Sequence, residues 1–99
     1  MAKQLRIYTL QEGRLDDWVR LYCERVRPLR ERSGFTVEGF AARGTNQFVW
    51  IVERPGSEAD FEAADRAYYE QPEHLPLHEE ALQYLAKGEA MFLDPVCEP

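Results

Sequence analysis

Two histidines, His74 and His78, stand four positions apart, which is the spacing of two metal ligands on one face of a helix. Pro76 lies between them, so the pair is not expected to share one regular helix. The glutamates around them suit a solvated, charged surface. We therefore expect no metal site and no bound cofactor. His78 alone is kept as a candidate acid–base group in a pocket or, as an alternative, an axial ligand of haem.

A second group, Asp65, Tyr68 and Tyr69, falls within about one turn of a predicted helix. Asp65 and Tyr68 are expected to share a face, with Tyr69 beside them. A carboxylate next to a phenol can orient a substrate or move a proton. The structural alternative is that Tyr68 packs in the core and donates its hydroxyl hydrogen to Asp65.

Arg6 and Tyr8 share one face of a predicted strand. A charge buried there needs a partner, because burying an unpaired charge is costly. One hypothesis pairs Arg6 with Glu38 or with a second copy of the chain. The other makes Arg6 an anchor for an anionic or carbonyl group in a pocket.

Aromatic residues supply the walls for such a pocket, although at these spacings they could equally be core residues. They are Trp18, Phe40, Phe48, Trp50, Phe61 and Phe92. The candidate substrate-binding residues are therefore Arg6, Tyr8, Trp50, Asp65, Tyr68 and His78. No residue is assigned a catalytic role, because the chain has no glycine-rich phosphate loop and no recognisable Ser–His–Asp order.

The strand at 47–53 is the element that must position these residues. Alternation places Phe48, Trp50 and Val52 on one face, and Val49 and Ile51 on the other. Both faces are apolar, which is typical of a sheet covered on both sides. Helices can cover one face. A homodimer that stacks sheet against sheet is the simplest cover for the other.

The remaining elements follow in a clear order. Strands are predicted at 4–10, 35–42, 47–53 and 89–93, the middle two forming a hairpin. An amphipathic helix begins at Leu15 and ends at Gly34, kinked or split by Pro28, with Arg30 among the arginines that complement its dipole. A second helix starts at a capping box of Ser57 and Asp60 and comes in two pieces, the later one at 77–86.

This βαββαβ order predicts an α+β chain with a ferredoxin-like plait. The sheet is antiparallel, all helices lie on one face, and the first and third strands are central. The 99 residues make a single domain, 1–99, with a core of about 4–96. A net charge of −6 argues against nucleic-acid and anionic membrane partners. The missing signal sequence and the distant Cys23 and Cys97 favour the cytoplasm.

Five segments resemble the NIPSNAP family in order and spacing: QLRIYTLQEGRLDDW, VRPLRERSGFTVEGF, NQFVWIVE, FEAADRAYYEQPE and MFLDPV. The resemblance spans 4–96, and its most specific block is FEAADRAYY at 61–69. It implies a dimeric α/β barrel of two ferredoxin-like subunits. The family has no established catalytic motif. The wider barrel superfamily includes cofactor-independent monooxygenases, haem-binding enzymes, isomerases, cyclases and dehydratases, so fold alone does not supply the activity.

The sequence therefore supports two hypotheses. In the first, the chain is a NIPSNAP-like protein of unassigned activity that binds a small hydrophobic metabolite between sheet and helices. Its enzymatic version is a cofactor-independent oxygenase, isomerase or cyclase. In the alternative, the chain is a non-catalytic homodimeric interaction module. That module would have no cavity of about 300 Å³ or more between sheet and helices.

Overall fold

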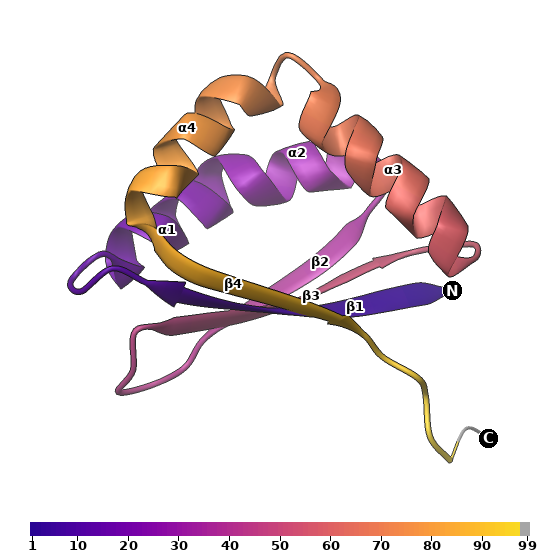
Figure 1. The fold of residues 1–99 in the computed structure, drawn as a ribbon, viewed down its shortest axis with the longest axis horizontal. Coiled ribbons are helices and arrows are strands. Elements are labelled where there is room, and N and C mark those ends of the chain that lie inside the picture. Colours follow the sequence, from indigo (N-terminus) through magenta and orange to yellow (C-terminus); the bar gives the residue numbers. More distant parts are fainter. Residues whose placement is uncertain (98–99) are drawn as a thin grey trace.

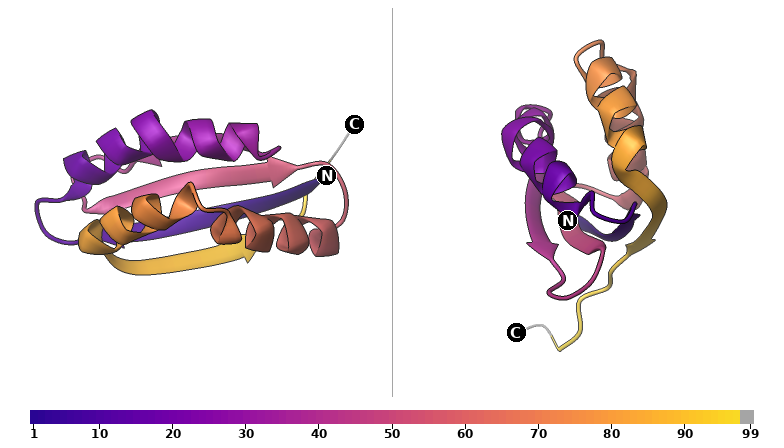
Figure 2. Two further views of the ribbon diagram at one scale, coloured as in Figure 1. Left: turned by 90° about the horizontal axis from the view of Figure 1, so that it is seen from above. Right: turned by 90° about the vertical axis from the view of Figure 1, so that its left-hand side faces the viewer.

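The computed structural model describes residues 1–97 and contains one four-stranded antiparallel sheet with helices on one face (Figures 1 and 2). The strands are β1 (Ala2–Leu10), β2 (Thr36–Ala41), β3 (Gln47–Arg54) and β4 (Leu85–Phe92). Their spatial order is β2-β3-β1-β4, so the first and third strands are central. The predicted ferredoxin-like α+β fold is confirmed.

The first helical segment is divided into three pieces. Helices α1 (Leu15–Leu21) and α2 (Arg27–Arg32) are joined by a π-helical stretch, η1 (Tyr22–Val26). Pro28 lies in the first turn of α2, where a missing N–H group is tolerated. The predicted division near Pro28 is thus confirmed. Gly34 has a φ of 91° and follows α2 in the expected left-handed conformation.

The second helical segment consists of α3 (Glu58–Glu70) and α4 (His74–Tyr84). The capping box is present at the start of α3: Ser57 accepts from the Asp60 N–H, and the Asp60 carboxylate accepts from the Ser57 N–H. In α4 the predicted start was wrong. Pro76 occupies the third position, where no intrahelical donor is needed, so His74 and His78 do share one regular helix.

The boundary between α4 and β4 was also predicted wrongly. The helix does not continue to residue 86, and the last strand begins at Leu85. Leu85 pairs with Leu10 across a β-bulge, and Gly88 is a strand residue beside the Tyr8 ring, not a helix stop. Leu82 on α4 is 59% exposed.

The two faces of the sheet differ in cover. On the helix side, Phe48, Trp50 and Val52 are buried. On the other side, Leu5, Ile7, Val49 and Ile51 are partly buried, while Phe40 is 48% and Met91 42% exposed. Within residues 1–97, no helix is both long enough and apolar enough to cross a bilayer. Cys23 is exposed on η1.

Candidate functional site

A cavity of 240 Å³ lies between the sheet and the helical segments. Its lining comes from β1, β3 and β4 and from all five helical pieces: α1, η1, α2, the C-terminal end of α3, and α4. The lining residues are Tyr8, Trp18, Val26, Arg30, Trp50, Tyr68, Tyr69, His74, Leu77, His78, Ala81, Leu82 and Leu85. Because His78 and Leu82 are exposed, the cavity reaches the surface beside α4.

The volume is just below the roughly 300 Å³ at which drug-sized pockets begin, so it fits a smaller molecule. By the threshold of about 300 Å³, volume alone favours the interaction module over a pocket for a drug-sized ligand. The chemistry of the lining is more informative.

One wall of the cavity is backed by two buried guanidinium groups. Arg6 is 4% and Arg30 1% exposed. Arg6 Nη2 lies 3.1 Å and Arg30 Nη1 2.7 Å from the same oxygen, Asp65 Oδ1. Both groups also donate to the Tyr69 hydroxyl, over 2.7 Å from Arg6 and 3.2 Å from Arg30. The two arginines therefore share one carboxylate and one phenol.

Arg6 pairs with a carboxylate, as one hypothesis expected, but that carboxylate is not Glu38. Glu38 pairs in register with Ile51, whose side chain lies on the helix-free face, so its carboxylate is on the opposite side of the sheet from Arg6. The intrachain partner is Asp65 on α3, and Arg6 Nε additionally donates to Gln4 Oε1 over 2.7 Å. Burial alone would lower the pKa of Arg6, but Tyr69 and Asp65 raise it, so the guanidinium stays charged.

The predicted hydrogen bond from Tyr68 to Asp65 is also wrong. Asp65 and Tyr69, four residues apart, are the pair that meets the arginines. Tyr68 instead packs its ring against Arg30, with the guanidinium carbon 3.7 Å from the ring centroid. This contact leaves the Tyr68 hydroxyl, which is buried, without a hydrogen-bond partner among residues 1–97.

Unpaired polar groups concentrate around this cavity. Buried polar groups are normally hydrogen-bonded, so each exception needs an explanation. Four of the buried polar atoms that have no partner within residues 1–97 belong to lining residues: Trp18 Nε1, Arg30 Nε, Trp50 Nε1 and Tyr68 Oη. All four can donate a hydrogen bond. These donors belong to residues around the cavity, but each donor atom is itself fully buried, so a ligand oxygen reaches one only if a lining side chain shifts.

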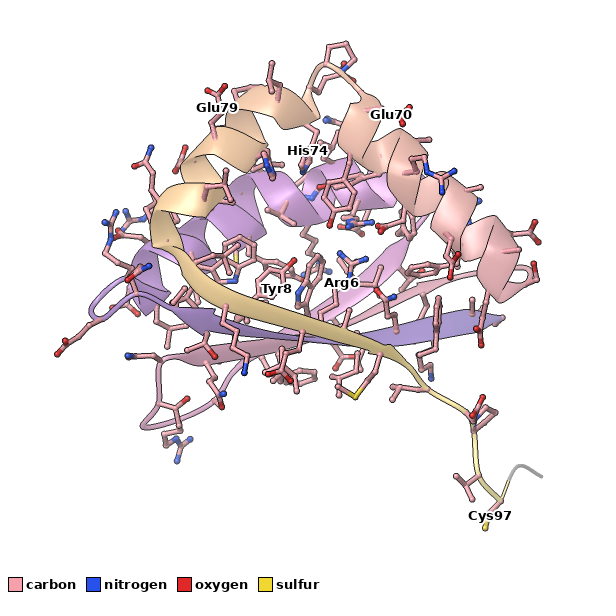
Figure 3. The ribbon with its side chains drawn as sticks, in the orientation of Figure 1. Arg6, Tyr8, Glu70, His74, Glu79 and Cys97 are labelled. Carbon is pink, nitrogen blue, oxygen red and sulfur yellow. The ribbon has the colours of Figure 1, made fainter. Side chains whose placement is uncertain are left out.

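His74 and His78 lie on the same face of α4, with ring centroids 5.5 Å apart. Figure 3 shows His74 at the start of α4, above Arg6 and Tyr8 on β1. Burial, His78 and Arg30 lower the pKa of His74 to about 4, so its imidazole is neutral at pH 7. His78 lies at the exposed mouth of the cavity. Within residues 1–97, no group of three or more His, Cys, Asp or Glu side chains is placed to hold a metal ion.

The predicted substrate-binding residues divide into two sets. Tyr8, Trp50, Tyr68 and His78 line the cavity, whereas Arg6 and Asp65 do not and instead hold Arg30 and Tyr69, which do. Among the polar residues of the lining, the list of candidate binding residues omitted three: Arg30, Tyr69 and His74. The sequence did indicate the side on which Arg30 lies. Arg30 follows Val26 by four positions in the same helical segment, and this spacing places both residues on the inner face.

Comparisons with known proteins establish the fold. No family model matches the sequence, and no curated protein sequence does. Solved structures do match. An uncharacterised NIPSNAP-domain protein from Burkholderia xenovorans has a TM-score of 0.86 at 15% identity, covering 98% of this chain and 96% of that one. A NIPSNAP-family protein from Agrobacterium tumefaciens has a TM-score of 0.85 at 14% identity, covering 97% and 93%. The chain has the NIPSNAP fold.

This fold extends beyond NIPSNAP proteins. SnoaB from Streptomyces nogalater, described as a cofactor-independent oxygenase, has a TM-score of 0.75 at 16% identity, with 98% of this chain and 94% of that one covered. The ferredoxin-like subunit fold implied by the sequence resemblance is thus confirmed along nearly the whole chain. At these identities the likeness concerns the fold, and function has to be argued from the site.

Proposed function

We propose that this NIPSNAP-fold chain binds a small, largely apolar molecule that carries oxygen, in the cavity between sheet and helices. The unpaired donors of Trp18, Trp50, Tyr68 and Arg30 around an otherwise aromatic and aliphatic lining are the observation that carries the proposal. When lining side chains shift to admit the ligand, an oxygen that accepts from these donors removes the cost of leaving them unpaired, and the apolar body of the ligand fills the remainder.

Catalysis by a cofactor-independent oxygenase, isomerase or cyclase is the enzymatic form of the same proposal. The description of SnoaB gives it some support. The titratable groups favour binding instead. Burial raises the pKa of Tyr8 and of Tyr68 to about 12, and His74, with a pKa of about 4, is a weak base. Near pH 7 such groups donate or accept hydrogen bonds better than they transfer protons.

The alternative is a homodimeric interaction module, and the helix-free face of the sheet favours the dimer itself. We propose that two chains pack these faces together. Exposed Phe40 and Met91 beside partly buried Ile7 and Ile51 form an apolar surface suited to this contact. Dimerisation is compatible with a ligand on the other side of each sheet. Whether the cavity binds a ligand therefore decides between a binding protein and an interaction module.

Filling the cavity tests the binding proposal. Ala81 lines it, and Ala81→Phe adds a ring there; Ala63→Phe places the same ring on the exposed side of α3 as the matched control. Native mass spectrometry of freshly purified protein is expected to show a small-molecule adduct on the wild-type chain and on Ala63→Phe, and none on folded Ala81→Phe. Adducts that persist equally in Ala81→Phe would contradict binding at this cavity.

A further inference from the structure

The buried charges beside the cavity do not balance. Arg6 and Arg30 contribute +2, and Asp65, the one carboxylate paired with either of them among residues 1–97, contributes −1. Guanidinium groups remain protonated in proteins. Tyr8 and Tyr68 are neutral phenols at pH 7, because burial raises the pKa of each to about 12. His74, also neutral, neither adds to the charge nor removes it.

The uncompensated positive charge belongs to a group that lines the cavity. Arg30 is 1% exposed, and its Nε has no partner within residues 1–97, although Nη1 and Nη2 are bound to Asp65 and Tyr69. Keeping such a charge in a water-poor site is costly unless an anion compensates it. Asp65 does so only in part, because its single oxygen Oδ1 serves both guanidinium groups.

From this we infer, building on the proposed function, that the ligand carries one carboxylate, held beside Arg30 with its apolar body among the aromatic rings. A single negative charge matches the net charge of +1. A planar carboxylate also suits a guanidinium, and the Trp50 ring, whose centroid lies 5.6 Å from the Arg30 guanidinium carbon, can pack against the ligand. A phosphate monoester, with close to two charges, would over-compensate the cluster and would find few polar contacts in this lining. The ligand class is therefore a small aromatic or aliphatic monocarboxylic acid.

The test compares acids with their neutral isosteres. Isothermal titration calorimetry at pH 7 measures the binding of benzoate and 1-naphthoate, each paired with its amide of nearly equal shape. Hydrogen bonds to a charged group predict that the acids bind about 10- to 100-fold more tightly than the amides. Amides that bind as tightly as the acids would overturn the carboxylate inference and leave the cavity proposal standing. If neither acids nor amides bind, both are wrong.

Two substitutions that change the local charge in opposite directions separate an effect of charge from an effect of structure. In Arg30→Met the preference for acid over amide is expected to disappear, whereas Arg27→Met, the loss of an exposed arginine on the same helix, leaves it unchanged. Asp65→Asn raises the local charge by one, so acid binding is expected to tighten, on the order of tenfold. Weaker acid binding in both Arg30→Met and folded Asp65→Asn would show that the cluster is merely structural. The comparison of acids with amides on the wild-type chain tests the inference without either variant.

Discussion

At the scale of single residues, the interior combines charged and neutral polar groups that depend on one another. Arg30 is held by Asp65 and Tyr69 on one side and packs on Tyr68 on the other. His74 lies against the same two tyrosines, with ring centroids 4.8 Å from each. A second positive charge so near Arg30 is unfavourable. Neutral His74 is therefore a condition for the packing of this region.

The first prediction concerns pH. Burial, His78 and Arg30 hold the pKa of His74 near 4, against about 6.5 in the unfolded chain. The unfolded state therefore binds more protons between those values, and the free energy of unfolding falls as pH drops through this window. Between pH 6.5 and 5 the expected loss is about 2 kcal/mol. Urea denaturation at the two pH values measures it.

Two substitutions test whether His74 causes this pH dependence of the free energy of unfolding. His74→Gln has no imidazole to protonate and is expected to flatten the dependence between pH 6.5 and 5, whatever its stability at pH 7. His78→Gln is the control on the same helix face and should keep most of it, because the buried ring is still present. An unchanged slope in His74→Gln would mean that another group causes the loss.

How much of the site the sequence predicts depends on where the decisive contact lies. Tyr8 and Trp50 could be placed on the inner face because alternation along a strand is a local property. Arg30 could not, because a charged residue near a helix end is ordinarily solvated. Its burial depends on Asp65, 35 positions later in the chain. The choice of Tyr69 over Tyr68 likewise reflects the approach of α3 to α2, which no short pattern encodes.

At the scale of elements, β2 packs closely against its neighbours at Gly39. A Cβ added there would lie 2.4 Å from Phe48 Cζ and 3.0 Å from the Tyr22 ring. Phe48 and Tyr22 are both buried, and their rings pack together with centroids 4.8 Å apart. Glycine at this position thus lets η1 and β3 share one aromatic layer.

The second prediction follows from that contact. Gly39→Ala is expected to destabilise the fold by about 1–3 kcal/mol, because two packed rings must move to admit a methyl group. Gly88→Ala on β4 is the matched control: its added Cβ meets the Tyr8 ring at 3.5 Å, an ordinary contact, so the change should stay within about 0.5 kcal/mol. Urea denaturation compares the two, and equal effects would contradict the packing argument.

Elements with strong local signals were predictable, and elements defined by pairing were less so. The apolar strand β3 and the capping box of α3 can each be recognised from a few consecutive residues. The first residues of β4 do not. Leu85 and Ala86 continue a helical pattern, and they become strand because Leu85 pairs with Leu10 and Lys87 with Thr9 of β1, on either side of Ala86. Long-range pairing overrides local propensity at this boundary.

At the scale of the whole molecule, the two faces of the sheet have separate roles. The helices cover one face (Figure 2), and the cavity with its charged cluster lies between them and the sheet. The other face presents apolar side chains without helical cover. A dimer that buries this face would fix the sheet from behind and so hold β1 and β3, which carry Tyr8 and Trp50, in place. Assembly and ligand binding would then be linked through the same two strands.

The last prediction tests the assembly. Each chain has a mass of 11.6 kDa, so sedimentation equilibrium should find twice that value for the wild-type protein. Met91→Glu and Phe40→Glu place a charge on the helix-free face, where both side chains are exposed in the single chain, and are expected to give folded monomers. Leu75→Glu, at a 61% exposed position on α4, is the matched control and should stay dimeric. A wild-type monomer would contradict sheet-on-sheet packing, and a monomeric Leu75→Glu beside dimeric Met91→Glu and Phe40→Glu would move the interface to the helices. If only substitutions on the helix-free face dissociate the dimer, the cavity side of each subunit is free to bind its ligand.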